Sequence, residues 1–318
     1  MVLDAVVTEP KLNPYKDLSP IEYVGMMRTV NENAVDHLRQ IFQDLPLAKD
    51  QCVVTIGSDG KGERHGQSKT EFMVIQNELH PPIVPMQIRR DLSKSLHRNV
   101  DSNIELKTLE DDRLLSLAFK NRKLVYPDRV LNAGFIIGNQ EIFHEARKRV
   151  LQEMTAAGPE SRRLREYMER QLWRYKKSIK TGLSRDVETF SASEGWQYYN
   201  ETPPHTGFGF KHGFLRATQR KFDILTARWI KQGVVTIDRL VEDLPTNTYE
   251  KFDYFSSMNL LSPNLARGAS EAYAWFLQQY HQVQEAYQET REPVVLDFST
   301  RALHEHAHPL TRFLNLIN

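Results

Sequence analysis

The residues best suited to chemistry lie in the segment 53-VVTIGSDGKGERHGQSKTEFMVI-75, where a glycine-rich basic loop joins two apolar runs. The pattern predicts a buried strand over 53–56, a sharp turn at Gly57-Ser58 and a second strand from Glu71. Backbone N–H groups freed in such a turn can point at an anion, and the Ser58 hydroxyl and Lys61 ammonium could join them. Glu71 stands where its carboxylate could hold a divalent cation. The loop therefore predicts a phosphate-binding turn beside a metal-binding acid, although the same pattern also fits an ordinary turn.

The order of residues in this loop resembles the signature of the polymerase-β-type nucleotidyltransferase superfamily. It is most similar to the protein-modifying branch, which contains protein-PII uridylyltransferases and related bacterial nucleotidyltransferases. Glu71 falls on the second acid of that family's Asp-x-Asp pair, whereas Lys69 occupies the position of the first acid. The glycine-rich part of the signature falls on Gly57, Ser58, Gly60, Lys61, Gly62, Glu63 and Ser68.

The resemblance continues, more diffusely, to about residue 232. The segment 101-DSNIELKTLEDDRLLSLAF-119 is similar to the part of the family that carries the third acid, which places Asp101 there, with Glu105 as a nearby substitute. The segment 128–147 resembles a helix pair of the family. The segment 211-KHGFLRATQRKFDILTARWI-230 resembles its Gly-Gly-Leu-Arg stretch, with Arg216 on the arginine.

The resemblance implies Mg²⁺-dependent transfer of a nucleoside monophosphate from a nucleoside triphosphate to a protein or small hydroxyl acceptor. Ser58 and the turn N–H groups would hold phosphate, Glu71 and Asp101 would hold metal, and Asp101 could instead be the base. Arg216 would face the cleft. Lys69 either removes one metal site or replaces that metal with its own ammonium.

Three hypotheses stay open on this evidence. The chain is an active nucleotidyltransferase, or a catalytically degenerate homologue that binds a nucleotide or a regulatory partner. In the third hypothesis it is a helical interaction protein whose Gly-Ser loop is only a turn.

The elements around the loop predict an α+β fold in which a small mixed sheet is followed by an all-helical bundle. A serine N-cap and a proline start a helix at Ser19-Pro20 that runs to about Leu45, with apolar residues at intervals of three and four. Beyond Leu109 the pattern is helical almost throughout, and the polar segment 181–209 is a loop or a lid. The expected strands cover 51–57, 71–76 and 103–108, with a helix over 85–97. The expected domains are an N-terminal arm (1–20), a nucleotidyltransferase-like domain (21–124) and a helical substrate- or partner-binding domain (125–318).

Composition is typical of a globular cytoplasmic protein, with 40% hydrophobic and 26% charged residues in 318. The net charge of +1 argues against a nucleic-acid partner or an anionic membrane surface. No secretory signal and no membrane span are expected. The single cysteine, Cys52, adjoins the first strand and is expected to be a small core residue.

Overall fold

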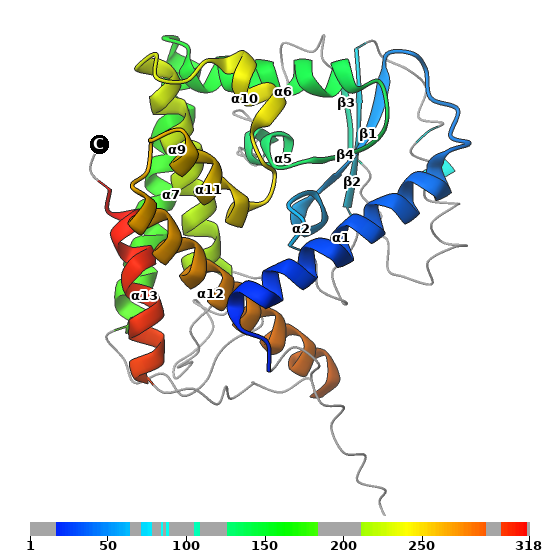
Figure 1. Cartoon of the computed structure of the whole chain (residues 1–318). Coiled ribbons are helices and arrows are strands. Elements are labelled where there is room, and N and C mark those ends of the chain that lie inside the picture. Colours follow the sequence, from blue (N-terminus) through cyan, green and yellow to red (C-terminus); the bar gives the residue numbers. More distant parts are fainter. Residues whose placement is uncertain are drawn as a thin grey trace, which may run out of the picture.

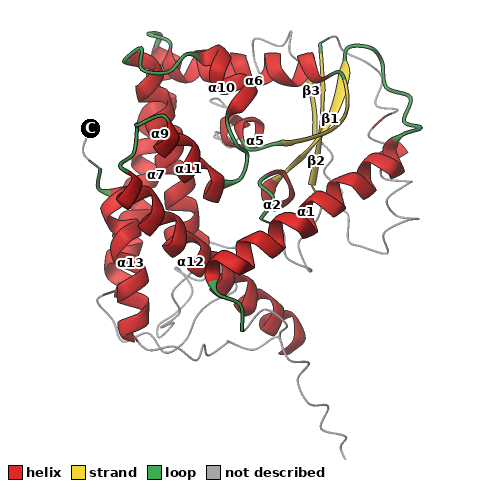
Figure 2. Ribbon diagram, in the orientation of Figure 1, coloured by secondary structure: helices red, strands yellow, loops and turns green. Residues whose placement is uncertain are grey.

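The computed structural model of the chain describes residues 17–63, 71–77, 84, 87–88, 105–108, 126–183, 211–290 and 300–316. Within these ranges the fold is α+β: a small sheet lies on one side and a larger group of helices on the other (Figure 2). None of the described helices is both long enough and apolar enough to cross a membrane.

Helix α1 (Pro20–Phe42) begins where its sequence predicts. Ser19 is the N-cap, and its backbone N–H and side chain both engage Glu22 in a capping box. The buried face of α1 does not include all of the apolar residues that recur at intervals of three and four, because Ile21 and Val30 are exposed. The residues that pack inward are Tyr23, Met27, Asn31, Leu38 and Phe42. In Figure 1 α1 runs obliquely across the molecule and connects the sheet side with α12 (Pro263–Thr290).

In the part of the chain that the structure describes, the sheet has four strands in the order β3-β2-β1-β4. The central strand β1 (Gln51–Ile56) pairs antiparallel with β2 (Glu71–Gln76), and β2 pairs parallel with β3 (Glu105–Thr108). The three predicted strands and the mixed character of the sheet are therefore confirmed. Alternate residues of β1 and β2 face opposite cores, as the two-residue period of a strand requires. Val53, Phe72 and Val74 join the core formed with α1, whereas Cys52, Val54, Ile56, Met73 and Ile75 join the core that extends into the helices.

The fourth strand corrects a prediction. Residues 128–147 were expected to form a helix pair, but β4 (Gly134–Gly138) lies between α5 (Tyr126–Leu131) and α6 (Gln140–Thr155) and pairs antiparallel with β1. Its two glycines allow this close approach. A Cβ on Gly134 would lie 2.9 Å from the Thr55 hydroxyl, and one on Gly138, whose φ is +101°, would lie 2.5 Å from the Gln51 carbonyl oxygen. The sheet thus takes a strand from beyond the boundary expected near residue 125.

The helices form one hydrophobic core with the inner face of the sheet. Helix α9 (Arg216–Lys231), preceded by a π-helical turn at Lys211–Leu215, is buried on almost every side, as a central helix must be. Phe222 of α9 packs on Phe252, Phe255 and Phe313. The dipeptides Gly158-Pro159, Leu244-Pro245 and Ser262-Pro263 fall at helix ends. The surrounding helices are α6, α7 (Pro159–Leu183), α10 (Ile237–Asp243), α11 (Thr248–Ser257), α12 and α13 (Thr300–Leu314).

Candidate functional site

The turn after β1 has a conformation that its glycines make possible. Gly57 has a φ of +69° and opens a single helical turn, α2 (Gly57–Gly60). A Cβ on Gly60 would lie 2.6 Å from the carbonyl oxygens of both Asn132 and Thr55, so only glycine fits there. Gly62 has a φ of +63°, and the N–H of Glu63 donates to the Ser58 carbonyl at 2.9 Å, which closes the loop on itself. We call residues 57–63 the glycine turn.

Glu71 lies against the start of this turn. The β1–β2 register places Glu71 opposite Ile56, the residue before Gly57. Its Oε2 atom is 2.6 Å from the position that a Cβ on Gly57 would occupy. The structure therefore brings together Gly57, the adjoining Ser58 and the half-buried carboxylate of Glu71, three of the residues singled out in the sequence.

Lys61 is engaged within the turn. Its Nζ atom lies 3.5 Å from Oε2 of Glu63, and the two side chains are 19% and 5% exposed. The cation expected to meet phosphate is thus partly shielded and has a carboxylate as its neighbour.

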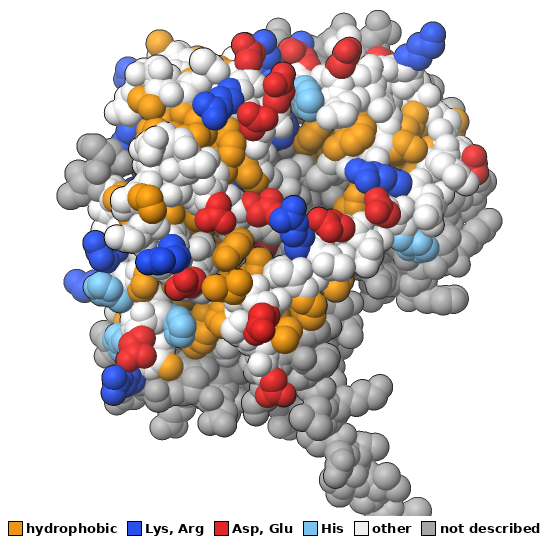
Figure 3. Space-filling view, in the orientation of Figure 1, with side chains coloured by type: hydrophobic (Ala, Val, Ile, Leu, Met, Phe, Trp, Pro, Cys, Tyr) orange, Lys and Arg blue, Asp and Glu red, His pale blue; other side chains and the backbone are white. Residues whose placement is uncertain are grey.

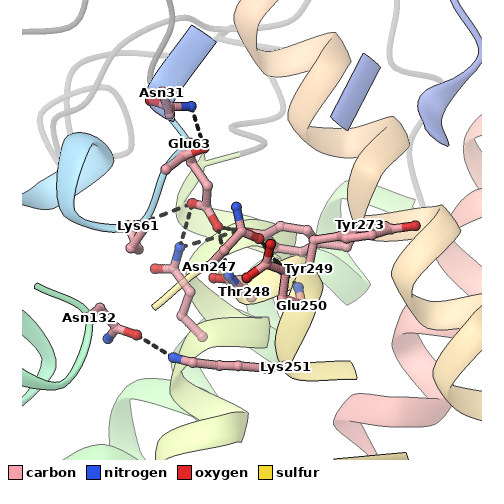
Figure 4. Close-up of polar contacts among 12 residues, drawn as sticks. Asn31, Lys61, Glu63, Asn132, Asn247, Thr248, Tyr249, Glu250, Lys251 and Tyr273 are labelled. Atoms are coloured by element: carbon pink, nitrogen blue, oxygen red, sulfur yellow. Dashed lines mark hydrogen bonds and ion pairs between the residues drawn. The ribbon is translucent and has the colours of Figure 1, made fainter. Parts of the chain in front are cut away.

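Glu63 is a buried acid whose carboxylate is held by three elements of the helical part (Figure 4). Oε1 accepts hydrogen bonds from the Tyr273 hydroxyl of α12 at 2.8 Å and from the Thr248 N–H of α11 at 3.3 Å. Oε2 accepts from Nε2 of Gln219 in α9 at 3.2 Å. Thr248 begins α11, so the carboxylate takes one of that helix's free N–H groups and lies at the positive end of its dipole. These donors and Lys61 compensate a charge whose burial would otherwise be strongly unfavourable.

Tyr273 is suited to donate to this acid at neutral pH. Burial, together with the negative charge of Glu63, raises the pKa of the Tyr273 hydroxyl well above its usual range. The hydroxyl therefore keeps its proton, and it also accepts a hydrogen bond from Gln219 at 3.3 Å.

Helix α1 holds the same turn from the other side. The Asn31 amide donates to the Gly62 carbonyl at 2.6 Å, next to Glu63 (Figure 4). Asn31 is itself buried, and its hydrogen bond to Gly62 explains why a polar residue lies on the inner face of α1. The glycine turn is thus fastened to α1, α9, α11 and α12.

Of the remaining residues predicted from the sequence, the structure describes Arg216 but not Lys69 or Asp101. Arg216 begins α9 and is half-buried, one helical turn before Gln219, so the two lie on the same side of the helix. Lys69 and Asp101 lie outside the described residues, so their predicted roles stay predictions. Of the expected loop or lid at 181–209, residues 181–183 instead end α7, and the rest lies outside the described residues. Among the residues that the structure describes, no group of three or more His, Cys, Asp or Glu side chains could hold a metal ion.

Sequence reasoning assigned no role to the anchor of the turn. Glu63 belongs to the glycine-rich signature, but its partners are 156, 185 and 210 residues away. The sequence offered one signal for this anchoring role of Glu63, which is an acid inside a loop that otherwise suits phosphate. A carboxylate there needs a structural partner.

A scan against protein-family models finds no match to this chain, and a search of curated proteins finds no significant match.

Proposed function

We propose that the chain binds a nucleoside triphosphate at the glycine turn and, with Mg²⁺, transfers a nucleoside monophosphate to a hydroxyl of a protein or small molecule. The observation that carries this proposal is the left-handed Gly57 with the Glu71 carboxylate against it. A backbone turn without a side chain, next to an acid, is what phosphate and a divalent cation require together.

Each residue has a role in this proposal. The turn N–H groups and the Ser58 hydroxyl hold phosphate oxygens, and Glu71, with Asp101, would hold Mg²⁺ through carboxylate oxygens. Mg²⁺ would neutralise charge on the triphosphate. Arg216 contributes a cation from α9, the helix that Gln219 links to the glycine turn.

The proposed division of labour gives nucleotide binding to 21–124 and acceptor choice to 125–318. The shared core and β4 support a close association of these parts, because α6 packs on the sheet as well as on α9. On the face in Figure 3, acidic and basic side chains are interspersed, which supports a protein or small-molecule acceptor over a nucleic acid.

A second candidate function is nucleotide or partner binding without transfer. Lys69 favours it, since a cation two residues before Glu71 in the sequence would repel a second metal ion held by that acid. At about 4 Å and an effective dielectric near 20, one pair of unit charges interacts by about 4 kcal/mol. In the alternative, the Lys69 ammonium replaces that metal and transfer persists.

Thermal melting with ATP, UTP, CTP and GTP, each with and without Mg²⁺, tests nucleotide binding directly. The melting temperature of the wild type should rise with at least one nucleotide, and Ser58→Asp should abolish the rise by placing a carboxylate where phosphate binds. Ser262→Asp, at an exposed serine before α12, is the control and should respond as the wild type does. An equal rise in wild type and Ser58→Asp would show that the glycine turn is not the phosphate site.

Transfer of an α-labelled nucleotide separates the two candidates. Lys69→Asp should increase Mg²⁺-dependent transfer if an acid restores two-metal chemistry, and should abolish it if the ammonium replaces a metal. Glu71→Ala should abolish transfer in both cases. Comparable transfer by the wild type, Lys69→Asp and Glu71→Ala would contradict both proposed roles of Lys69.

A further inference from the structure

Two anions, the Glu63 carboxylate and a bound triphosphate, would compete for the ammonium of Lys61. Lys61 lies between Gly60 and Gly62 in a loop that the Glu63 N–H closes onto Ser58, so its backbone belongs to the proposed phosphate cradle. In the described structure its ammonium lies 3.5 Å from Glu63. A bound triphosphate would offer the same ammonium a denser negative charge.

Glu63 can release Lys61 without becoming an isolated buried charge. Its carboxylate keeps the hydroxyl of Tyr273, the N–H of Thr248 and the amide of Gln219, at 2.8, 3.3 and 3.2 Å. The contact with Lys61 is the longest of the four. Hydrogen bonds to a charged acceptor are the stronger kind, so the helices alone hold the carboxylate in place.

Lys61 is the more exposed member of the pair. Its side chain is 19% exposed while that of Glu63 is 5% exposed, so an anion from solvent can approach the Lys61 side chain more readily. The long alkyl stem of lysine lets the charged end change partner while the backbone stays fixed.

We propose that Lys61 exchanges its partner from the Glu63 carboxylate to phosphate when nucleotide binds, and that Glu63 thereby sets the affinity of the glycine turn. This inference rests on the proposed phosphate site. Glu63 is a positioning residue with two opposed effects: it fastens the turn to α9, α11 and α12, and it competes with the ligand for Lys61.

The exchange predicts that removing the charge of Glu63 tightens phosphate binding, although Glu63 also fastens the turn. Glu63→Gln keeps an oxygen that accepts hydrogen bonds but removes the competing charge, so phosphate binding should tighten about tenfold, which corresponds to about 1.4 kcal/mol. Lys61→Gln should weaken binding by a similar factor. In the Lys61→Gln background, Glu63→Gln should give no gain, because no ammonium remains to be released.

The experiment measures binding of inorganic triphosphate with Mg²⁺ by titration calorimetry, since the phosphates are the part of the ligand that the turn contacts. The set comprises the wild type, Glu63→Gln, Lys61→Gln and the double variant. Glu305→Gln is the matched control, because it removes the same charge from the exposed pair of Arg301 and Glu305 on α13. It should leave the affinity unchanged.

Tyr273→Phe separates competition from fastening. It loosens the anchor without changing its charge, so it should weaken binding or leave it unchanged, and its melting temperature without ligand should fall. Tighter binding in Glu63→Gln alone therefore supports exchange, even if that variant melts at a lower temperature.

The possible failures are distinguishable. Binding to wild type that Glu63→Gln weakens or leaves unchanged overturns the exchange and leaves the phosphate site standing. Tightening that persists in the Lys61→Gln background also overturns it. If neither the wild type nor Glu63→Gln binds triphosphate, the phosphate site and the exchange are both overturned. If Glu63→Gln binds triphosphate and the wild type does not, both are supported.

Discussion

The hydroxyl of Tyr273 donates a 2.8 Å hydrogen bond to the carboxylate of Glu63, across 210 residues of sequence. One partner closes the glycine turn after β1 and the other lies in the middle of α12. Both side chains are buried. The geometry of the glycine turn is therefore determined as much by the helices as by the sheet that precedes it.

Removing this hydrogen bond should destabilise the whole chain. Tyr273→Phe leaves the buried carboxylate with one donor fewer, and we expect a loss of about 1.5–3 kcal/mol in the free energy of unfolding. Urea denaturation measures it. The control is Tyr167→Phe, which removes an i,i+4 bond with Gln171 on α7 and should cost about 0.5 kcal/mol or less. Equal losses in the two variants would contradict a special role for the Tyr273–Glu63 bond.

The start of the glycine turn should tolerate no side chain. Gly57→Ala forces an ordinary residue into a φ of +69° and places its methyl group 2.6 Å from Oε2 of Glu71. We expect a loss of about 1–3 kcal/mol from backbone strain, with displacement of the Glu71 carboxylate. Gly25→Ala is the control, because nothing lies within 4 Å of its Cβ position in α1 and it should gain up to about 1 kcal/mol. Chemical denaturation that ranks the two variants in the opposite order would rule out this account.

The parts of the fold that could be predicted are those specified by local pattern. The Ser19-Pro20 start of α1 and the strands β1 and β2 follow from capping chemistry and from short apolar runs bounded by turn residues. The glycine turn follows from its spacing. The proximity of Glu71 follows from the antiparallel register of the two strands.

The parts that escaped prediction depend on distant neighbours. The run Gly-Phe-Ile-Ile-Gly at 134–138 is too short to distinguish strand from helix by periodicity, and it becomes β4 because β1 offers it an edge. The inner face of α1 includes Asn31, because the Gly62 carbonyl accepts a hydrogen bond from it, whereas Ile21 and Val30 are exposed. The three donors to Glu63 have no local signature, since each comes from a different helix.

Arg216 provides a test of the helical side of the site. Under the proposed function, Arg216→Ala should weaken nucleotide binding about tenfold, or about 1.4 kcal/mol, because a cation near phosphate is lost. The free energy of unfolding should fall by no more than about 1 kcal/mol, since the side chain is only half-buried. Titration calorimetry measures the first quantity and urea denaturation the second. The control is Arg239→Ala on the exposed face of α10, and unchanged affinity in both variants would remove α9 from the binding site.

Cys52 should be chemically silent in the folded chain. It is fully buried in β1, and burial raises the pKa of its thiol to about 12. At pH 8 only about one thiol in ten thousand would then be a thiolate, the reactive form. A thiol-reactive chromophoric disulfide should give no signal with native protein and one equivalent per chain in guanidinium, because the chain has one cysteine. Fast reaction under native conditions would place Cys52 at the surface or in a region that opens readily.

Lys221 should make the stability of the chain rise with pH in alkaline solution. Its side chain is 3% exposed on α9, and its ammonium donates to the Leu316 carbonyl at 2.8 Å. Burial, followed by the charges of Arg228 and Lys176, lowers its pKa from 10.5 to about 8. Between these two values the unfolded chain binds more protons than the folded chain, so the free energy of unfolding increases as pH rises through this window.

Replacing the amine isolates this contribution. Lys221→Met should be more stable than wild type below pH 8, by about 1–2 kcal/mol after allowance for solvent screening and the lost hydrogen bond. The difference should shrink toward pH 10.5, where the unfolded-state amine also loses its proton. Urea denaturation at pH 7.5, 9 and 10.5 measures it, as a difference between proteins because tyrosines with raised pKa, such as Tyr273, lower stability at still higher pH in both. Lys180→Met, at an exposed lysine of α7, should follow the wild-type curve, and a Lys221→Met curve parallel to wild type would show that this amine does not change its charge on folding.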